Sequence, residues 1–241
     1  MRNLFRYSTI KNLAFSLAEI VLVLGIIGAV GVLGVTNAKK DTDTAEKVTQ
    51  LKKTYEIIDA AFTQAVMENG SHAKWGTNGG YPDPSQLWAV VSPYFQLLKN
   101  CGTGTGCWKD AVPLKLNRTA TNTNINSSNH FAKGILANGV SIAISPKSED
   151  FIRGKSEGML LILVDVNGKK GLNMMGNDIF GFLIDTNEQL TPLISTRNPN
   201  EEIHHTTIDL YKTPWVLQFG NMDYLKPCAG NLSWTGNHTC R

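Results

Sequence analysis

Four side chains with oxygen ligands lie close together in the second half of the chain: Asp165, Asn167, Asn173 and Asp178. Carboxylate and amide oxygens are the ligands that Ca²⁺ prefers, and a calcium site uses about six to eight of them. The spacing is not that of an EF-hand, and the pattern Asp-x-Asn-Gly is also common in hairpin turns. We therefore treat these four residues as candidate calcium ligands, with a plain turn as the alternative.

The four cysteines form two local pairs, Cys101 with Cys107 and Cys228 with Cys240. Four cysteines allow three pairings, and sequence does not decide among them, although local pairing closes two short loops. Zinc binding is the alternative, but neither pair has the Cys-x2-Cys-like spacing of zinc sites. We predict the disulfides Cys101–Cys107 and Cys228–Cys240, which an exported domain permits.

The familiar enzyme motifs are missing from the sequence. Residues 102–106 (GTGTG) lack the Lys-Ser/Thr of a phosphate-binding loop. His204 and His205 form an isolated pair in a polar segment, and neither Gly-x-Ser-x-Gly nor His-Glu-x-x-His occurs. We predict that the chain is not an enzyme.

The charge balance also argues against nucleic-acid binding. Lys and Arg number 23 and Asp and Glu number 20, so the formal net charge is +3. Three of the basic residues, Arg2, Arg6 and Lys11, lie in the first fourteen positions. The rest of the chain is therefore balanced, and it carries no basic stripe of the kind that binds phosphate backbones.

The N-terminal region is organised like a membrane anchor. Residues 1–14 are basic and contain no acid, and residues 15–35 hold a single charge, Glu19. As a helix, residues 15–35 would be about 31 Å long, which is enough to cross the hydrocarbon core of a bilayer. Because basic flanks stay on the cytoplasmic side, everything after residue 35 is predicted to be exported.

The segment Ala14, Phe15, Ser16, Leu17, Ala18, Glu19 resembles the processing site of type IV prepilins. In that family a membrane peptidase cuts before a phenylalanine, and the new terminal amine is commonly N-methylated. The residue before the cut is nearly always glycine in the family, whereas it is Ala14 here. The resemblance implies a cut between Ala14 and Phe15, with prepilin peptidase and the inner-membrane assembly machinery as partners.

Glu19 is the residue of this segment that most needs an explanation. An acid inside a membrane helix costs about 2.5–3.5 kcal/mol near the centre of the bilayer, so it calls for a partner. The resemblance implies that this partner is the charged amine of Phe15 in a neighbouring subunit, which would set the register of assembly. The alternative is a glutamate that reaches the headgroup layer by itself.

A second helical pattern follows the apolar stretch. Apolar residues recur at alternating spacings of three and four, with polar residues between them; they are Val48, Leu51, Tyr55, Ile58, Phe62 and Ala65. Asn69 and Gly70 form a plausible helix stop, because glycine readily supplies a left-handed cap. Residues 15–67 are therefore predicted to form one helix about 80 Å long.

The remainder of the chain is predicted to be loop and then sheet. Residues 71–130 are rich in Gly, Asn, Thr, Ser and Pro, with one helical piece near residues 84–100. Strands are expected at 135–136, 140–144, 159–166, 179–184 and 190–194, with Asn-Gly turns after the first and third. These strands predict an antiparallel sheet of four or five strands.

The predicted fold is α+β and pilin-like: a long N-terminal helix, partly transmembrane, packed on an antiparallel sheet. Its parts are a leader (1–14), a transmembrane and polymerisation helix (15–35), an amphipathic continuation (36–68) and an exported head (69–241). Residues 165–182 and 215–225 are also similar to head segments of pseudopilin-like proteins associated with type II secretion. The resemblance implies a filament subunit in the inner membrane that pairs with itself or other pilins, contacts lipid, and enters a periplasmic or cell-surface filament. The alternatives are a membrane-anchored or secreted binding protein that uses residues 1–35 as a signal-anchor or signal peptide, and an exported hydrolase with dispersed catalytic residues.

Overall fold

The computed structural model describes the backbone of residues 17–79, 82–146, 158–194 and 209–240, and the side chains within these ranges from residue 42 onward. The chain divides into two compact units, residues 1–43 and residues 44–241. Helix α1 (Leu17–Asn69) begins in the first unit and ends in the second. The second unit contains all the other described elements and both disulfides.

Within the second unit, α1 uses the face that the apolar periodicity predicts. Five of the six periodic residues are buried in the hydrophobic core and Tyr55 is partly buried against it. The helix ends at Asn69, and Gly70 follows with a left-handed φ of +74° while its amide donates to the Val66 carbonyl at 2.8 Å. The predicted stop at Asn69 and Gly70 is therefore confirmed.

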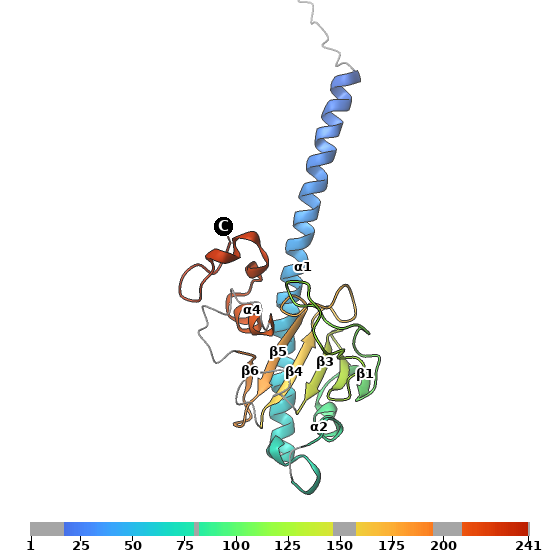
Figure 1. The fold of residues 1–241 in the computed structure, drawn as a ribbon, viewed down its shortest axis with the longest axis vertical. Coiled ribbons are helices and arrows are strands. Elements are labelled where there is room, and N and C mark those ends of the chain that lie inside the picture. Colours follow the sequence, from blue (N-terminus) through green and yellow to red (C-terminus); the bar gives the residue numbers. More distant parts are fainter. Residues whose placement is uncertain (1–16, 80–81, 147–157, 195–208, 241) are drawn as a thin grey trace, which may run out of the picture. The chain divides into compact units, whose positions relative to one another are not determined.

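A six-stranded antiparallel sheet lies against this helix (Figure 1). Its strands follow one another in sequence order; they are β1 (Leu97–Gly102), β2 (Ala132–Leu136), β3 (Ser141–Ser145), β4 (Leu160–Asp165), β5 (Ile179–Ile184) and β6 (Leu190–Pro192). This is the simplest antiparallel topology, because each strand pairs with the next strand along the chain. The α+β class is confirmed, with one strand more than the sequence predicted.

The additional strand comes from the segment predicted to be helical near residues 84–100. Helix α2 covers only Pro84–Val91, where Asp83 caps the first turn through a capping box with Gln86. Pro93 lies in the short 3-10 turn that follows, and proline lacks the amide that would continue an α-helix. The chain then turns extended, so residues 97–102 form edge strand β1 instead of more helix.

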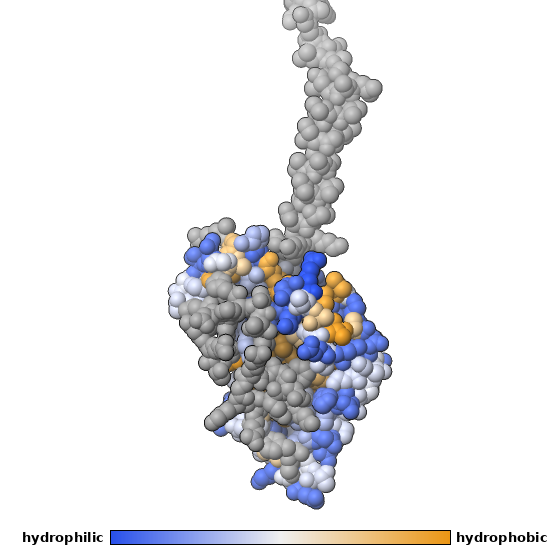
Figure 2. Space-filling model, viewed as in Figure 1, coloured by the Kyte–Doolittle hydropathy of each residue, from blue (hydrophilic) through white to orange (hydrophobic). Residues whose placement is uncertain are grey.

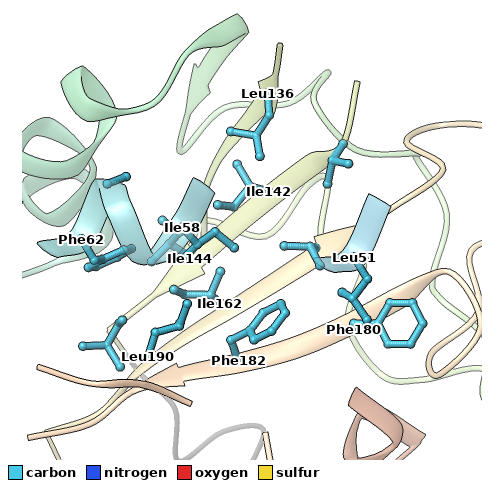
Figure 3. Close-up of a cluster of buried hydrophobic side chains, with 14 of the residues drawn as sticks. Leu51, Ile58, Phe62, Leu136, Ile142, Ile144, Ile162, Phe180, Phe182 and Leu190 are labelled. Atoms are coloured by element: carbon cyan, nitrogen blue, oxygen red, sulfur yellow. The ribbon is translucent and has the colours of Figure 1, made fainter. Parts of the chain in front are cut away.

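Both faces of the sheet are buried, which explains the uninterrupted apolar run in β4. Ile144, Ile162 and Phe182 face the core that contains Leu51, Ile58 and Phe62 of α1 (Figure 3). Alternate residues of the same strands face a second cluster, which Trp108, Ile125, Phe131, Leu193 and Leu210 complete. Every residue of β4 and β5 is buried, as expected for strands packed on both sides.

The C-terminal segment packs beside the sheet. It contains a 3-10 turn (Asp209–Lys212), α4 (Thr213–Phe219) and two further 3-10 turns (Asp223–Leu225 and Pro227–Asn231). The structure contains both predicted disulfides, Cys101–Cys107 and Cys228–Cys240, with Cα–Cα distances of 6.0 and 5.8 Å. In Figure 2 the visible described surface is mostly hydrophilic, with a small hydrophobic patch.

Candidate functional site

The residues of the predicted processing and assembly site are not open to structural test. Ala14 and Phe15 lie outside the described residues, and Glu19 lies in α1 where only the backbone is described. Among the described residues, no helix combines the length and apolarity needed to cross a membrane. The predicted span, residues 15–35, includes residues outside that description, so the cut before Phe15 and the role of Glu19 stay predictions.

The four candidate calcium ligands do come together in the structure. Asp165 ends β4, Asp178 precedes β5, and the two strands pair with Asp165 opposite Ile179. The connection between them folds back because Gly168 adopts a left-handed φ of +63° and donates to the Asp165 carbonyl at 3.1 Å. The amide of Asn173 donates to Asp165 Oδ2 at 2.8 Å, and that of Asn167 donates to Asp178 Oδ1 at 3.0 Å.

A lysine from α1 completes this arrangement, and we call Lys47, Asp165, Asn167, Asn173 and Asp178 the polar cluster. Lys47 Nζ lies 2.9 Å from Asp178 Oδ1, and these two side chains are only 10% and 3% exposed. An ion pair with so little solvent is strongly coupled, because water no longer screens it. Lys47 therefore ties the helix to the β4–β5 connection, a role that its sequence position alone did not indicate.

Burial shifts the acid–base behaviour of the cluster. Burial, with the nearby negative charge of Asp178 as a second cause, raises the pKa of Asp165 to about 8. Burial also raises the pKa of Asp178, against the opposing effect of its contact with Lys47. Near neutral pH Asp165 thus holds a proton, and Lys47 and Asp178 form the close cation–carboxyl contact of the cluster.

Three oxygens of the cluster have no hydrogen-bond partner within the part of the chain that the structure describes: Asp165 Oδ1, Asn167 Oδ1 and Asn173 Oδ1. Buried oxygens of this kind fit a hard cation such as Ca²⁺. Lys47 already provides one positive charge, and the described side chains include no group of three or more His, Cys, Asp or Glu residues that could hold a metal. Calcium stays a prediction, to be tested by whether Ca²⁺ raises the melting temperature and whether Asp165→Asn abolishes the rise.

The polar cluster extends toward the C-terminal segment. Asp209 is buried and its Oδ2 accepts from the Leu116 amide at 2.7 Å. The Tyr224 hydroxyl donates to the Gly176 carbonyl at 2.7 Å. Burial raises the pKa of Asp209 and takes that of Tyr224 well above its ordinary value. The connection that meets Lys47 of α1 is therefore also held by Tyr224, through the Gly176 carbonyl.

One grouping has the composition of a catalytic triad but not its geometry. Ser71 Oγ donates to Glu188 Oε1 at 2.6 Å, and His72 Nδ1 is paired with Glu188 Oε2. The other ring nitrogen of His72 faces the Gly158 carbonyl at 2.9 Å, not the serine. A nucleophilic serine needs the imidazole as its base, so this grouping has no activated nucleophile. Instead, it fastens the chain just after α1 to the turn between β5 and β6.

Comparison with known proteins adds no assignment. No family model matches the chain, and no curated protein or solved structure matches it either.

Proposed function

We propose that the chain is a structural subunit of a type IV pilus-like filament or a type II secretion pseudopilus, processed before Phe15 and assembled through its N-terminal helix. The observation that carries the proposal is helix α1. It runs without interruption from Leu17 to Asn69, downstream of the prepilin-like segment, and its last half packs on an antiparallel sheet.

The packing gives the helix a firm attachment to the rest of the second unit. Apolar residues of α1 from Val48 to Ala65 lie in the main hydrophobic core. Lys47 adds the buried ion pair with Asp178, one residue before those contacts begin. A load on the N-terminal part of such a helix would reach the sheet through continuous backbone and packed side chains, which suits a subunit held in a filament by its helix.

The charges of the N-terminal segment supply the assembly chemistry in this proposal. Cleavage before Phe15 creates a positively charged amine beside an apolar stretch whose single charge is Glu19. Each charge is expensive in apolar surroundings unless it is paired. Pairing between the amine of one subunit and Glu19 of the next would favour one axial register.

Mass spectrometry of the mature protein from membranes tests the proposal. The expected N-terminus is Phe15, methylated. An N-terminus near Ala38 would indicate an ordinary secreted protein released by signal peptidase. A chain that starts at Met1 would indicate a signal-anchored protein, and either result would contradict the filament proposal.

A further inference from the structure

The C-terminal disulfide loop encloses a hollow that the filament role does not use. The hollow has a volume of about 490 Å³, within the range of about 300–1,000 Å³ that small-molecule sites occupy. It is lined by residues of the segment that the Cys228–Cys240 disulfide closes; this segment is the red C-terminal part of the ribbon in Figure 1. Its polar side chains are those of Asn231, Asn237, His238 and Thr239.

Hydrogen bonds hold the backbone of the residues that line the hollow. The Cys240 amide donates to Asp223 Oδ2 at 2.7 Å, and the amide of Asn221 donates to the His238 carbonyl at 3.0 Å. The Ser233 amide donates to the Asn237 carbonyl at 3.0 Å, which closes a turn in the rim. A rim held by a disulfide and several hydrogen bonds loses little conformational freedom when a ligand binds.

Aromatic side chains pack behind His238, one of the lining residues. The His238 ring stacks on Phe219 with ring centroids 4.0 Å apart, and Trp215 meets His238 edge-on at 6.1 Å. Trp234 packs against both Trp215 and Phe219 at 5.3 Å. The imidazole is thus stacked on Phe219, and its Nε2 lies 3.2 Å from the Trp234 carbonyl.

The chemistry of the lining indicates the ligand class. Among the described residues, the lining contains no Asp, Glu, Lys or Arg, and the nearby charges of Asp223 and Lys226 are paired with each other at 2.8 Å. Within the described part of the chain, the side chains of Asn231, Asn237 and Thr239 make no hydrogen bond. Amides and hydroxyls offer donors and acceptors side by side, which matches the paired hydroxyls of a sugar.

We propose that this hollow, framed by Cys228 and Cys240 and lined by Asn231, Asn237, His238 and Thr239, binds a neutral carbohydrate. The inference does not depend on the filament proposal, because it rests on the head alone. An amide pair recognises neighbouring hydroxyls, and the described lining offers no charged side chain to pair with an acidic or basic sugar.

Binding is tested with the full chain in a zwitterionic detergent without sugar headgroups. The probes are glucose, galactose, N-acetylglucosamine and their disaccharides, with glucuronate and glucosamine as charged counterparts. Tryptophan fluorescence and saturation-transfer NMR report binding, since Trp215 meets the stacked imidazole edge-on and Trp234 packs against Trp215. The expected result is binding of at least one neutral sugar, with the charged counterparts much weaker.

Two pocket variants and one matched control locate the site. Asn237→Asp keeps the shape of the side chain and its backbone contact with Ser233, and Asn231→Ala removes an exposed amide. Each is expected to weaken binding about fivefold to tenfold, the effect of losing one hydrogen bond of about 1 kcal/mol. Asn129→Asp, an exposed asparagine outside the hollow, is expected to bind like the parent.

Three results would overturn the proposal: no neutral sugar binds, the pocket variants bind as tightly as the parent, or charged sugars bind equally well. Thermal unfolding of each variant separates loss of binding from loss of fold. Should Asn237→Asp unfold, Asn231→Ala decides the question by itself, because that side chain is exposed and makes no described hydrogen bond.

Discussion

Two regions of this chain hold an acidic side chain away from water in the filament proposal, and in that proposal they differ in where the partner of the acid comes from. Asp178 is buried in the head and meets Lys47 of the same chain at 2.9 Å. Glu19 lies in an apolar stretch, residues 15–35, that contains no basic residue. A charge neutralised within the chain stabilises the folded head, whereas a charge that awaits a partner from another subunit can drive assembly. The comparison predicts that substitutions in the two regions have opposite consequences.

Removing the partner of the buried acid should have the largest effect on stability. Lys47→Met leaves Asp178 buried without its counter-charge, because the two side chains are only 10% and 3% exposed. The expected loss is about 3–5 kcal/mol in the free energy of unfolding. Urea unfolding followed by tryptophan fluorescence measures it.

Two further variants sharpen this prediction. Lys53→Met removes an exposed lysine from the same helix and is expected to change stability by no more than about 0.5 kcal/mol. Lys47→Met combined with Asp178→Asn removes both charges and should recover part of the loss. If Lys47→Met unfolds at the same urea concentration as Lys53→Met, the ion pair does not hold the helix to the sheet.

The two disulfides are expected to contribute about 2–3 kcal/mol each, in the chain-entropy description of loop closure. Cys228–Cys240 spans 12 residues and Cys101–Cys107 spans 6, so replacing the C-terminal pair by serine should lower stability slightly more. Thermal unfolding of the two double-serine variants makes the comparison. Unchanged melting temperatures in both would show that neither loop closure stabilises the head.

Asp165 provides an effect with a distinct pH signature. Its pKa is about 8 when folded and near 4 when unfolded, so between these values the folded chain holds a proton that the unfolded chain has lost. The stability from this proton is complete below about pH 4 and disappears as the pH rises toward about 8, at up to about 1.4 kcal/mol per pH unit. Asp165→Asn cannot titrate, so its stability relative to the parent should increase from pH 5 to pH 8.

The measurement is urea unfolding of parent and variant at these two pH values. Asp209, whose pKa is also raised by burial, titrates in both proteins, so the difference reports Asp165 together with its coupling to Asp178. A constant difference between parent and variant across this range would show that Asp165 is not protonated in the folded head.

Local pattern was sufficient to predict the helix and most of the sheet. The spacing of apolar residues by three and four predicted the buried face of α1, and Gly70 predicted where the helix ends. The strand at 179–184 was predicted with the bounds that the structure has. These features depend on residues that are close in sequence. The spacing of apolar residues and the residue types found in turns therefore predict them directly.

The missed features depend on contacts between distant residues. Lys47 meets a carboxylate 131 positions away, and nothing in its neighbourhood distinguishes it from the exposed Lys53. Lys133 in β2 is fully buried and donates to the carbonyls of Ile125, Asn126 and Ser128, at 3.3, 3.1 and 2.6 Å. Such lysines look like surface residues in the sequence, because their partners are backbone or remote side chains that only the fold brings near.

The central claim, that the chain assembles through its N-terminal helix, is tested most directly with Glu19→Gln. The substitution keeps the size of the side chain, removes its charge, and leaves the Lys47–Asp178 pair of the head untouched. Tagged parent and variant are co-expressed, and their ratio in sheared filaments is compared with their ratio in membranes. The account predicts that the variant is cleaved before Phe15, has a head that unfolds at the parent's temperature, and is depleted about tenfold in filaments, equivalent to about 1.4 kcal/mol. Equal ratios in filaments and membranes would contradict it.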